Sequence, residues 1–237
     1  NSRMCAQGHR PICQDTGIVT VFLKIGMKVQ WDATLSVSDM VNEGVRRAYT
    51  NPDNVLRASI LEDPAGARRN TRDNTPAVIH MEVVPGDTVD VQVAAKGGGS
   101  ENKSKLVMLN PSDSIVDWVV KTIPTMGAGW CPPGMLGIGI GGTAEKAALL
   151  AKEALMDPID IHELRERGPA SRVEELRLEI MEAVNKLGIG AQGLGGLTTV
   201  MDVKIRDYPT HAASLPVAMI PNCAATRHAH FLLDGSG

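Results

Sequence analysis

The sequence has few aromatic residues, little net charge and no long apolar run. Phenylalanine, tryptophan and tyrosine make up 3% of 237 residues, whereas glycine (24) and proline (14) are plentiful, so we expect much turn and loop. A net charge of −3 lacks the basic excess with which proteins displace counterions from nucleic-acid phosphates. No apolar run approaches the roughly 20 residues of a membrane-spanning helix. The composition therefore argues against nucleic-acid and membrane partners.

The first residues, NSRMCAQGHRP, lack the apolar core of a signal peptide, so we expect a cytosolic protein. Because the sequence starts at Asn1 and not at a methionine, we also expect residues upstream of it. The four cysteines are Cys5, Cys13, Cys131 and Cys223. In a reducing compartment, cysteines in loops serve as metal ligands or nucleophiles, or have no role beyond packing.

Apolar periodicity predicts both strands and helices. β-branched residues predict a strand at 17–26, and alternation predicts a hairpin over 77–95 that turns at Pro85 and Gly86. Further strands are expected at 135–142, 198–209, 215–223 and 228–235. Helices are expected at 38–51 with Ser38 as cap, at 112–123, at 143–155 and, after a capping box of Ser171 and Glu174, at 171–188.

These elements predict an α+β fold with mixed or antiparallel sheets flanked by helices. We expect one domain over residues 1–237, with two closely packed lobes and a possible boundary between 156 and 157.

Three cysteines share a local setting beside proline or another turn-forming residue, in RPICQDTG, GWCPPG and IPNCAATRH. Cys13, Cys131 and Cys223 lie far apart in the sequence, which excludes a zinc site of the CxxC type. Three interpretations remain open. The thiols are unrelated packing residues, or they hold a four-iron, four-sulfide cluster with one open iron, or they bind zinc with His211 or His228 as the fourth ligand.

Five segments, RPICQDTG, KGGGSENKS, GWCPPG, GIGAQGLGG and PNCAATRHAHF, follow one another across nearly the whole chain. Together they resemble class I fumarate hydratase, the iron-sulfur type, and particularly its separate alpha subunit. The resemblance implies a 4Fe-4S cluster held by Cys13, Cys131 and Cys223. It also implies reversible hydration of fumarate to (S)-malate, a step of the tricarboxylic acid cycle, and a beta subunit in a two-fold alpha/beta assembly. The tartrate dehydratase alpha subunit is similar, although KGGGSENKS is closer to the fumarase form.

The resemblance further implies residue roles. Asp15 would be the general acid that protonates the departing hydroxide, and the beta subunit would supply the base, a threonine. Gln14, Arg57, Gly99 and His211 would contact the substrate. From the residues alone, Arg57 reads as a surface arginine, His211 as a turn histidine and KGGGS as a flexible loop or an anion-binding nest.

One further motif, GIGIGG at residues 137–142, matches a dinucleotide-binding fingerprint. The acidic residue that such a site requires would be Asp160, but Asp160 lies in a proline-broken, helix-like stretch. We therefore expect a tight turn between a strand and a helix near the cluster. A nicotinamide oxidoreductase and a non-catalytic zinc-bearing assembly subunit remain alternatives from other functional classes.

Overall fold

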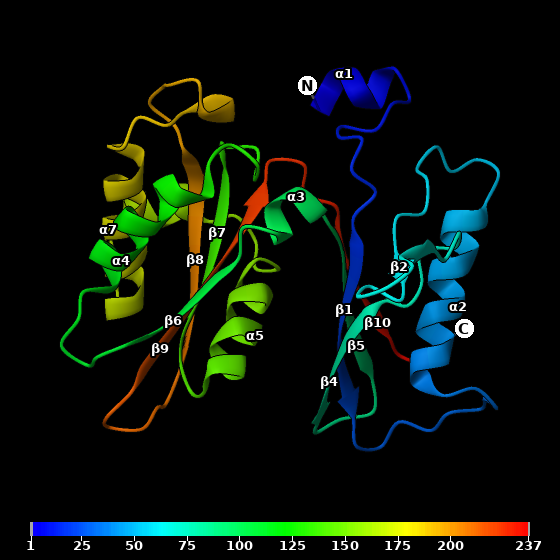
Figure 1. Cartoon of the computed structure of the whole chain (residues 1–237). Coiled ribbons are helices and arrows are strands. Elements are labelled where there is room, and N and C mark those ends of the chain that lie inside the picture. Colours follow the sequence, from blue (N-terminus) through cyan, green and yellow to red (C-terminus); the bar gives the residue numbers. More distant parts are fainter. Residues whose placement is uncertain (1, 237) are drawn as a thin grey trace. The chain divides into compact units, whose positions relative to one another are not determined.

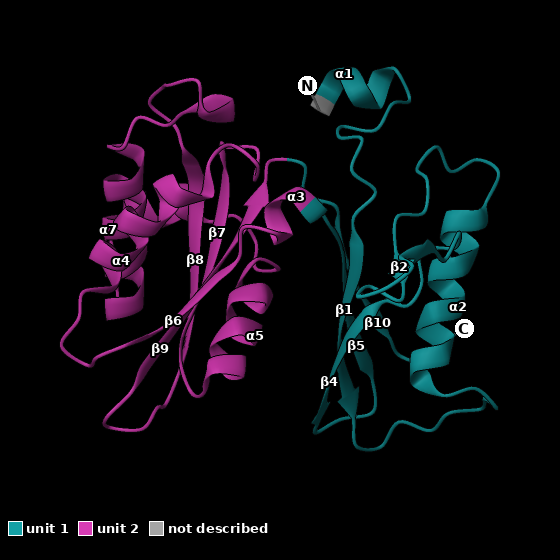
Figure 2. Ribbon diagram, viewed as in Figure 1, with its two compact units in different colours: residues 1–98, 225–237 teal, residues 99–224 magenta. Residues whose placement is uncertain are grey.

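The computed structural model describes residues 2–236 and has the predicted α+β composition (Figure 1). The chain divides into two compact units (Figure 2). Unit 1 comprises the residues up to Gly98 and those from Ala225, and unit 2 comprises Gly99–Ala224. The last strand returns to the sheet of unit 1. The expected lobe boundary between 156 and 157 falls inside unit 2.

Unit 1 is built on a four-stranded mixed sheet in the order β10-β5-β1-β4. Its strands are β1 (Ile18–Gly26), β4 (Val78–Val84), β5 (Val89–Lys96) and β10 (His228–Leu233). β1 runs parallel to β4 and antiparallel to β5. Its run of apolar, β-branched residues suits this central position, where both of its edges are hydrogen-bonded.

The hairpin predicted over 77–95 is wrong. Both strands form, but β1 lies between β4 and β5, so the turn at Pro85 and Gly86 joins strands that do not pair. Turn chemistry reports only on neighbouring residues. The apolar β1, far upstream in the sequence, buries Val19, Val21 and Leu23 in the position between the two strands.

One helix, α2 (Val37–Thr50), packs on the sheet of unit 1. Its cap is Ser36 and not the predicted Ser38, because the Ser36 hydroxyl accepts a hydrogen bond from the Asp39 amide at 3.1 Å. Val45 joins valines of β1 and β5 in a small apolar core. Unit 1 also contains α1 (Ser2–Gln7) and the two short strands β2 (Leu61–Glu62) and β3 (Arg69–Asn70).

Unit 2 has a second four-stranded sheet, in the order β6-β9-β7-β8. Its strands are β6 (Lys105–Leu109), β7 (Gly134–Gly141), β8 (Val200–Tyr208) and β9 (Leu215–Cys223). Helices cover both faces of this sheet (Figure 1). They are α4 (Ile115–Thr122) and α7 (Arg172–Asn185) on one face and α5 (Ala144–Ala154) on the other. The remaining elements are α3 (Gly98–Glu101), α6 (Ile161–Arg167) and two 3₁₀ turns, Ile123–Met126 and Ala191–Gly193.

Close packing explains the glycines of β7. A Cβ atom added to Gly139 would lie 1.9 Å from the carbonyl oxygen of Ala147, and one added to Gly137 would lie 2.1 Å from that of Ala151. Both contacts are far inside van der Waals distance, so only glycine lets the backbone of α5 lie directly on this strand.

The predicted helix after Ser171 is confirmed as α7. The Ser171 hydroxyl accepts a hydrogen bond from the Glu174 amide at 3.3 Å, and Leu176, Ile180 and Val184 are buried on one helical face. The Glu174 carboxylate accepts from the Ala170 amide at 2.7 Å, one residue earlier than in a standard capping box.

A group of four charged residues, of which Arg177, Asp202 and Lys204 are buried, joins α7 to β8 and to the turn before α6. Arg177 donates to Asp160 at 2.5 Å and lies 3.2 Å from the fully buried Asp202. Lys204 lies 2.7 Å from Asp160 and 3.0 Å from Asp202. Two cations therefore meet two anions, so the group is neutral as a whole, which is the condition for keeping charges in an interior.

No helix in residues 2–236 is both long enough and apolar enough to cross a lipid bilayer.

Candidate active site

The segment Cys13–Gly17 of unit 1 forms the first part of the candidate site. The Asp15 amide donates to the Cys13 sulfur at 3.4 Å, and the Gly17 amide donates to Asp15 Oδ1 at 3.0 Å. Gly17 has a φ of +86°, which favours glycine, and a Cβ there would lie 2.8 Å from the carbonyl carbon of Ala95. Both the backbone conformation and the available space therefore require glycine at this position. The turn therefore fixes the Asp15 carboxylate and the Cys13 sulfur relative to the start of β1.

Side chains from α2 and from two loops hold the backbone of this turn. Arg227 donates to the carbonyl oxygen of Asp15, Tyr49 to that of Thr16 at 3.1 Å and Asn74 to that of Gly17 at 3.2 Å. Burial raises the pKa of Tyr49, which keeps its hydroxyl protonated and able to donate. Three successive carbonyl groups thus each have a donor.

Sequence reasoning missed these three supporting residues. Arg227 lies inside the quoted segment PNCAATRHAHF but was given no role, and nothing in the sequence singles out Tyr49 or Asn74. Asn74 is fully buried, and its own φ is +60°, which is uncommon for a residue other than glycine. Such backbone geometry becomes visible only in the structure.

Two other predicted residues lie near the turn within unit 1. The Thr16 hydroxyl donates to the carbonyl oxygen of Arg57 at 2.5 Å, which brings the exposed Arg57 next to the turn. Gln14 is also exposed. Asp15 Oδ2 lies 3.8 Å from the position that a Cβ of Gly98 would take, so the KGGGS segment begins beside the Asp15 carboxylate.

Cys131 in unit 2 lies on a tight turn ahead of β7. It is exposed and has a φ of +57°, which is uncommon for a residue other than glycine. Its amide donates to the carbonyl oxygen of Ala128 at 2.9 Å. The turn therefore keeps the thiol at the surface while the neighbouring Trp130 is fully buried.

Cys223 is the last residue of β9 and lies at the same end of the sheet's strands as Cys131. Cys223 pairs with Gly134, three residues after Cys131, in the antiparallel register of β7 and β9. A Cβ on Gly134 would lie 2.2 Å from the carbonyl oxygen of Asn222, so glycine allows this close approach. The structure thus brings two of the three predicted ligands to one end of unit 2.

Two glycine segments support the Cys131 turn. A Cβ on Gly99 would lie 2.8 Å from the carbonyl oxygen of Gly129, so KGGGS meets the turn two residues before Cys131. From GIGAQGLGG, the Gln192 amide donates to the carbonyl oxygen of Pro132 at 2.6 Å. Segments far apart in the sequence therefore converge on this end of the sheet.

The cysteines of unit 2 offer thiols, and thiolates are the usual ligands of iron-sulfur clusters. In residues 2–236, no three His, Cys, Asp or Glu side chains gather into a metal-ion site. The residues that precede the two cysteines in the sequence carry buried donors without a hydrogen-bond acceptor, Trp130 Nε1 and Asn222 Nδ2. Thiolate and sulfide sulfurs are acceptors, and N–H groups near such sulfurs are typical of cluster sites.

His211 lies at the other end of unit 2. It follows β8, whose last residue, Tyr208, pairs with the last residue of β7, Gly141. Cys131 precedes β7, so a strand length of roughly 20 Å separates the histidine from Cys131 and Cys223. The His211 of the same chain is therefore too distant to be the fourth ligand of a zinc site with these cysteines. His228, the other candidate for that ligand, belongs to unit 1.

The GIGIGG turn also lies at this opposite end, and not near the cysteines as expected. It does join a strand to a helix, with φ of +90° at Gly141 and +68° at Gly142. Asp160 is engaged with Arg177 and Lys204. Packing against α5 accounts for the other two glycines of the motif, so no feature of the turn requires a nucleotide.

Comparison with known proteins gives a family match over nearly the whole chain. The family model described as "Fumarate hydratase (Fumerase)" matches residues 1–232. The putative L(+)-tartrate dehydratase subunit alpha of Methanocaldococcus jannaschii is 37% identical over 97% of this chain and 80% of its own length. The L(+)-tartrate dehydratase subunit alpha of Escherichia coli O157:H7 is 32% identical over 95% and 73%, and that of strain K12 is 31% identical over the same shares.

Proposed function

Because the chain belongs to the fumarate hydratase (Fumerase) family, we propose that it is the alpha subunit of a hydro-lyase that reversibly hydrates fumarate to (S)-malate. The observation that carries this proposal is the placement of Cys131 and Cys223 at one end of the sheet, with Gly99 against the Cys131 turn. The relatives are named as alpha subunits, so a beta subunit is expected to complete the enzyme.

Cys13, Cys131 and Cys223 would hold a 4Fe-4S cluster in the proposed enzyme. Cys13 belongs to unit 1 and the other two cysteines to unit 2, so the proposal needs both units. With only three protein thiolates, such a cluster supplies one open iron that acts as a Lewis acid toward the hydroxyl and carboxylate of the substrate.

Asp15 is the proposed general acid. Its Oδ1 accepts the Gly17 amide, and Arg227 holds its backbone carbonyl, so the carboxyl group has a fixed position before substrate arrives. In the dehydration direction, Asp15 would donate a proton to the departing hydroxide. The base that removes the C–H proton would come from the beta subunit.

The remaining proposed residues bind the dicarboxylate. Arg57, held near the turn by its carbonyl contact to Thr16, suits a carboxylate because guanidinium groups form paired hydrogen bonds with it. Gly99 would offer its backbone amide and Gln14 its side-chain amide. His211 would reach the substrate only from a second copy of the chain, in agreement with a two-fold alpha/beta assembly.

The names of the relatives favour a second candidate, dehydration of L(+)-tartrate. Turnover of fumarate, (S)-malate and L(+)-tartrate, measured side by side on the alpha/beta complex, distinguishes the two. We expect kcat/KM for fumarate to exceed that for tartrate by roughly tenfold or more. The reverse ratio would assign the chain to tartrate dehydration, and no turnover of any of the three would overturn the hydro-lyase proposal.

A further inference from the structure

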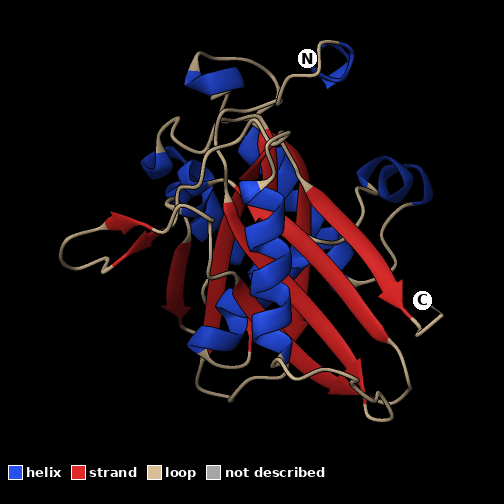
Figure 3. Cartoon of the chain, turned by 90° about the vertical axis from the view of Figure 1, so that its right-hand side faces the viewer, coloured by secondary structure: helices blue, strands red, loops and turns tan. Residues whose placement is uncertain are grey.

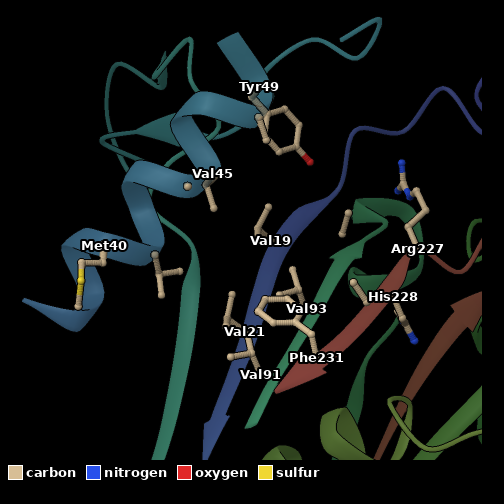
Figure 4. Close-up of a pocket in the computed structure, with 15 residues that line it drawn as sticks. Val19, Val21, Met40, Val45, Tyr49, Val91, Val93, Arg227, His228 and Phe231 are labelled. Atoms are coloured by element: carbon tan, nitrogen blue, oxygen red, sulfur yellow. The ribbon is translucent and has the colours of Figure 1, made fainter. Parts of the chain in front are cut away.

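The sheet of unit 1 is covered by helix over only part of its apolar face. α2 lies across this face and leaves strands beside it uncovered (Figure 3). A groove of about 540 Å³ runs between α2 and the strands β1, β5 and β10 (Figure 4). We call it the α2 groove, and the residues that define it include Val21, Gly44, Ala48, Val93, Arg227 and Phe231.

The dimensions of the α2 groove match a helix. Neighbouring strands lie about 4.8 Å apart and a helix with its side chains is about 10 Å wide, so a four-stranded sheet needs two helices side by side. Unit 1 supplies α2 alone. On the uncovered side, Phe231 and Leu233 of the edge strand β10 are 46% and 49% exposed on the same face as Val91 and Val89.

The side of α2 that faces the groove is flat. A Cβ on Gly44 would meet nothing within 4 Å, and Ala48 follows one turn later. Glycine in a helix interior lowers stability relative to alanine. A partner that packs on the open side of Gly44 would offset that loss. Small residues spaced four apart allow a second helix to approach within the 8–10 Å typical of helix pairs.

The groove also has one polar end, at Arg227 (Figure 4). Arg227 Nη1 donates to the Asp15 carbonyl, whereas its buried Nε has no hydrogen-bond acceptor. A buried guanidinium donor without an acceptor is costly, so an acidic side chain at this end would complement it in both charge and hydrogen bonding.

The geometry points to one amphipathic helix as the occupant of the α2 groove, with an apolar face on the sheet and an acidic residue near Arg227. We assign this helix to the part of the alpha subunit that the relatives carry outside the matched region. That part is about a fifth of the M. jannaschii relative and over a quarter of the E. coli relatives. The inference rests on the surface of unit 1 and does not depend on the reaction.

The test uses labelled peptides that tile the unmatched residues of the M. jannaschii alpha subunit, with binding followed by fluorescence anisotropy. We expect one peptide to bind and to become helical by circular dichroism. Gly44→Leu fills the groove, so it should weaken binding roughly tenfold or more. Arg46→Leu is the matched control, because Arg46 bonds to Asp73 away from the groove, and it should leave binding unchanged.

Ala48→Leu tests the same face one turn further along, should Gly44→Leu not fold. Binding of no peptide at about 1 mM, or binding that neither leucine variant weakens, would overturn the inference. A concentration-dependent dimer of the chain that Gly44→Leu dissociates would assign the groove to a second copy instead, and would also overturn it.

Discussion

The two sheets of this chain have four strands each but are stabilised differently. The sheet of unit 2 has helices on both faces, and a largely buried group of four charges joins α7 to β8. The sheet of unit 1 has one helix and leaves large apolar side chains exposed on its edge strands. Unit 2 therefore has helices on both faces of its sheet, although Leu106 and Met108 of its edge strand β6 are exposed, whereas the apolar face of unit 1 is covered only in part.

The same contrast extends to the two parts of the candidate site. In unit 2, the Cys131 turn is shaped by close backbone packing at Gly99 and Gly134, where a side chain would clash with a neighbouring carbonyl oxygen. In unit 1, the Asp15 turn is held by donors from Arg227, Tyr49 and Asn74. Substitutions at the unit 1 turn should therefore cost activity first, and substitutions in unit 2 should cost stability first.

The largest effect is expected for Asp15→Asn. Asparagine still accepts the Gly17 amide through Oδ1, so the turn and the melting temperature should be preserved. It cannot donate a carboxyl proton, and general acid catalysis contributes about 10²–10⁴-fold, so kcat in the alpha/beta complex should fall by about 10³-fold. Retention of activity within tenfold would remove Asp15 from the proposed role.

The buried charges of unit 2 provide the largest expected effect on stability. Arg177→Met leaves the fully buried Asp202 with Lys204 alone and should lower the free energy of unfolding by about 3 kcal/mol. Arg172→Met on the same helix breaks only exposed ion pairs and should change the free energy of unfolding far less. Urea unfolding of both variants checks this, and equal losses would contradict the account.

A pair of glycine substitutions contrasts the units directly. Gly139→Ala in β7 forces a contact with the Ala147 carbonyl and should destabilise the protein by about 1–3 kcal/mol. Gly44→Ala in α2 meets open space and raises helix propensity, so it should stabilise by about 0.5–1 kcal/mol. The melting temperatures of the two variants show whether each substitution stabilises or destabilises the protein. Destabilisation by Gly44→Ala would show that the α2 groove is already filled.

The smallest effect concerns acid stability. The hydrogen bond from Arg177, strengthened by Lys204, holds the pKa of Asp160 well below its usual range although partial burial opposes this. The stabilisation is thus fully present above the unfolded pKa of about 4 and is lost as the pH falls further. Asp160→Asn should flatten the decline of unfolding free energy between about pH 4 and pH 2, and an unchanged slope would contradict this assignment.

The sequence predicted most elements because their signals are local. Ser171 with Glu174 and the apolar face around Ile180 define α7 without reference to the rest of the chain. The pairing of β4 and β5 with β1, and the return of β10 to unit 1, depend on long-range contacts that no local pattern reports.

For the candidate site, residue types were accessible from the sequence but their positions were not. The proline and glycine turns located Cys13, Cys131 and Cys223, yet only strand register shows that Cys223 shares an end with Cys131 and that His211 does not. Tyr49 and Asn74 act through bonds to backbone carbonyls, a role that their sequence surroundings do not encode.

The central proposal is that Cys13, Cys131 and Cys223 hold one cluster, and metal analysis tests it most directly. Iron and acid-labile sulfide per chain are measured after anaerobic reconstitution of the wild type, Cys131→Ser and, as control, Cys5→Ser. The account predicts about four irons and four sulfides in the wild type and in Cys5→Ser, and their loss in Cys131→Ser. Zinc alone, no metal, or a cluster that persists in Cys131→Ser would contradict it.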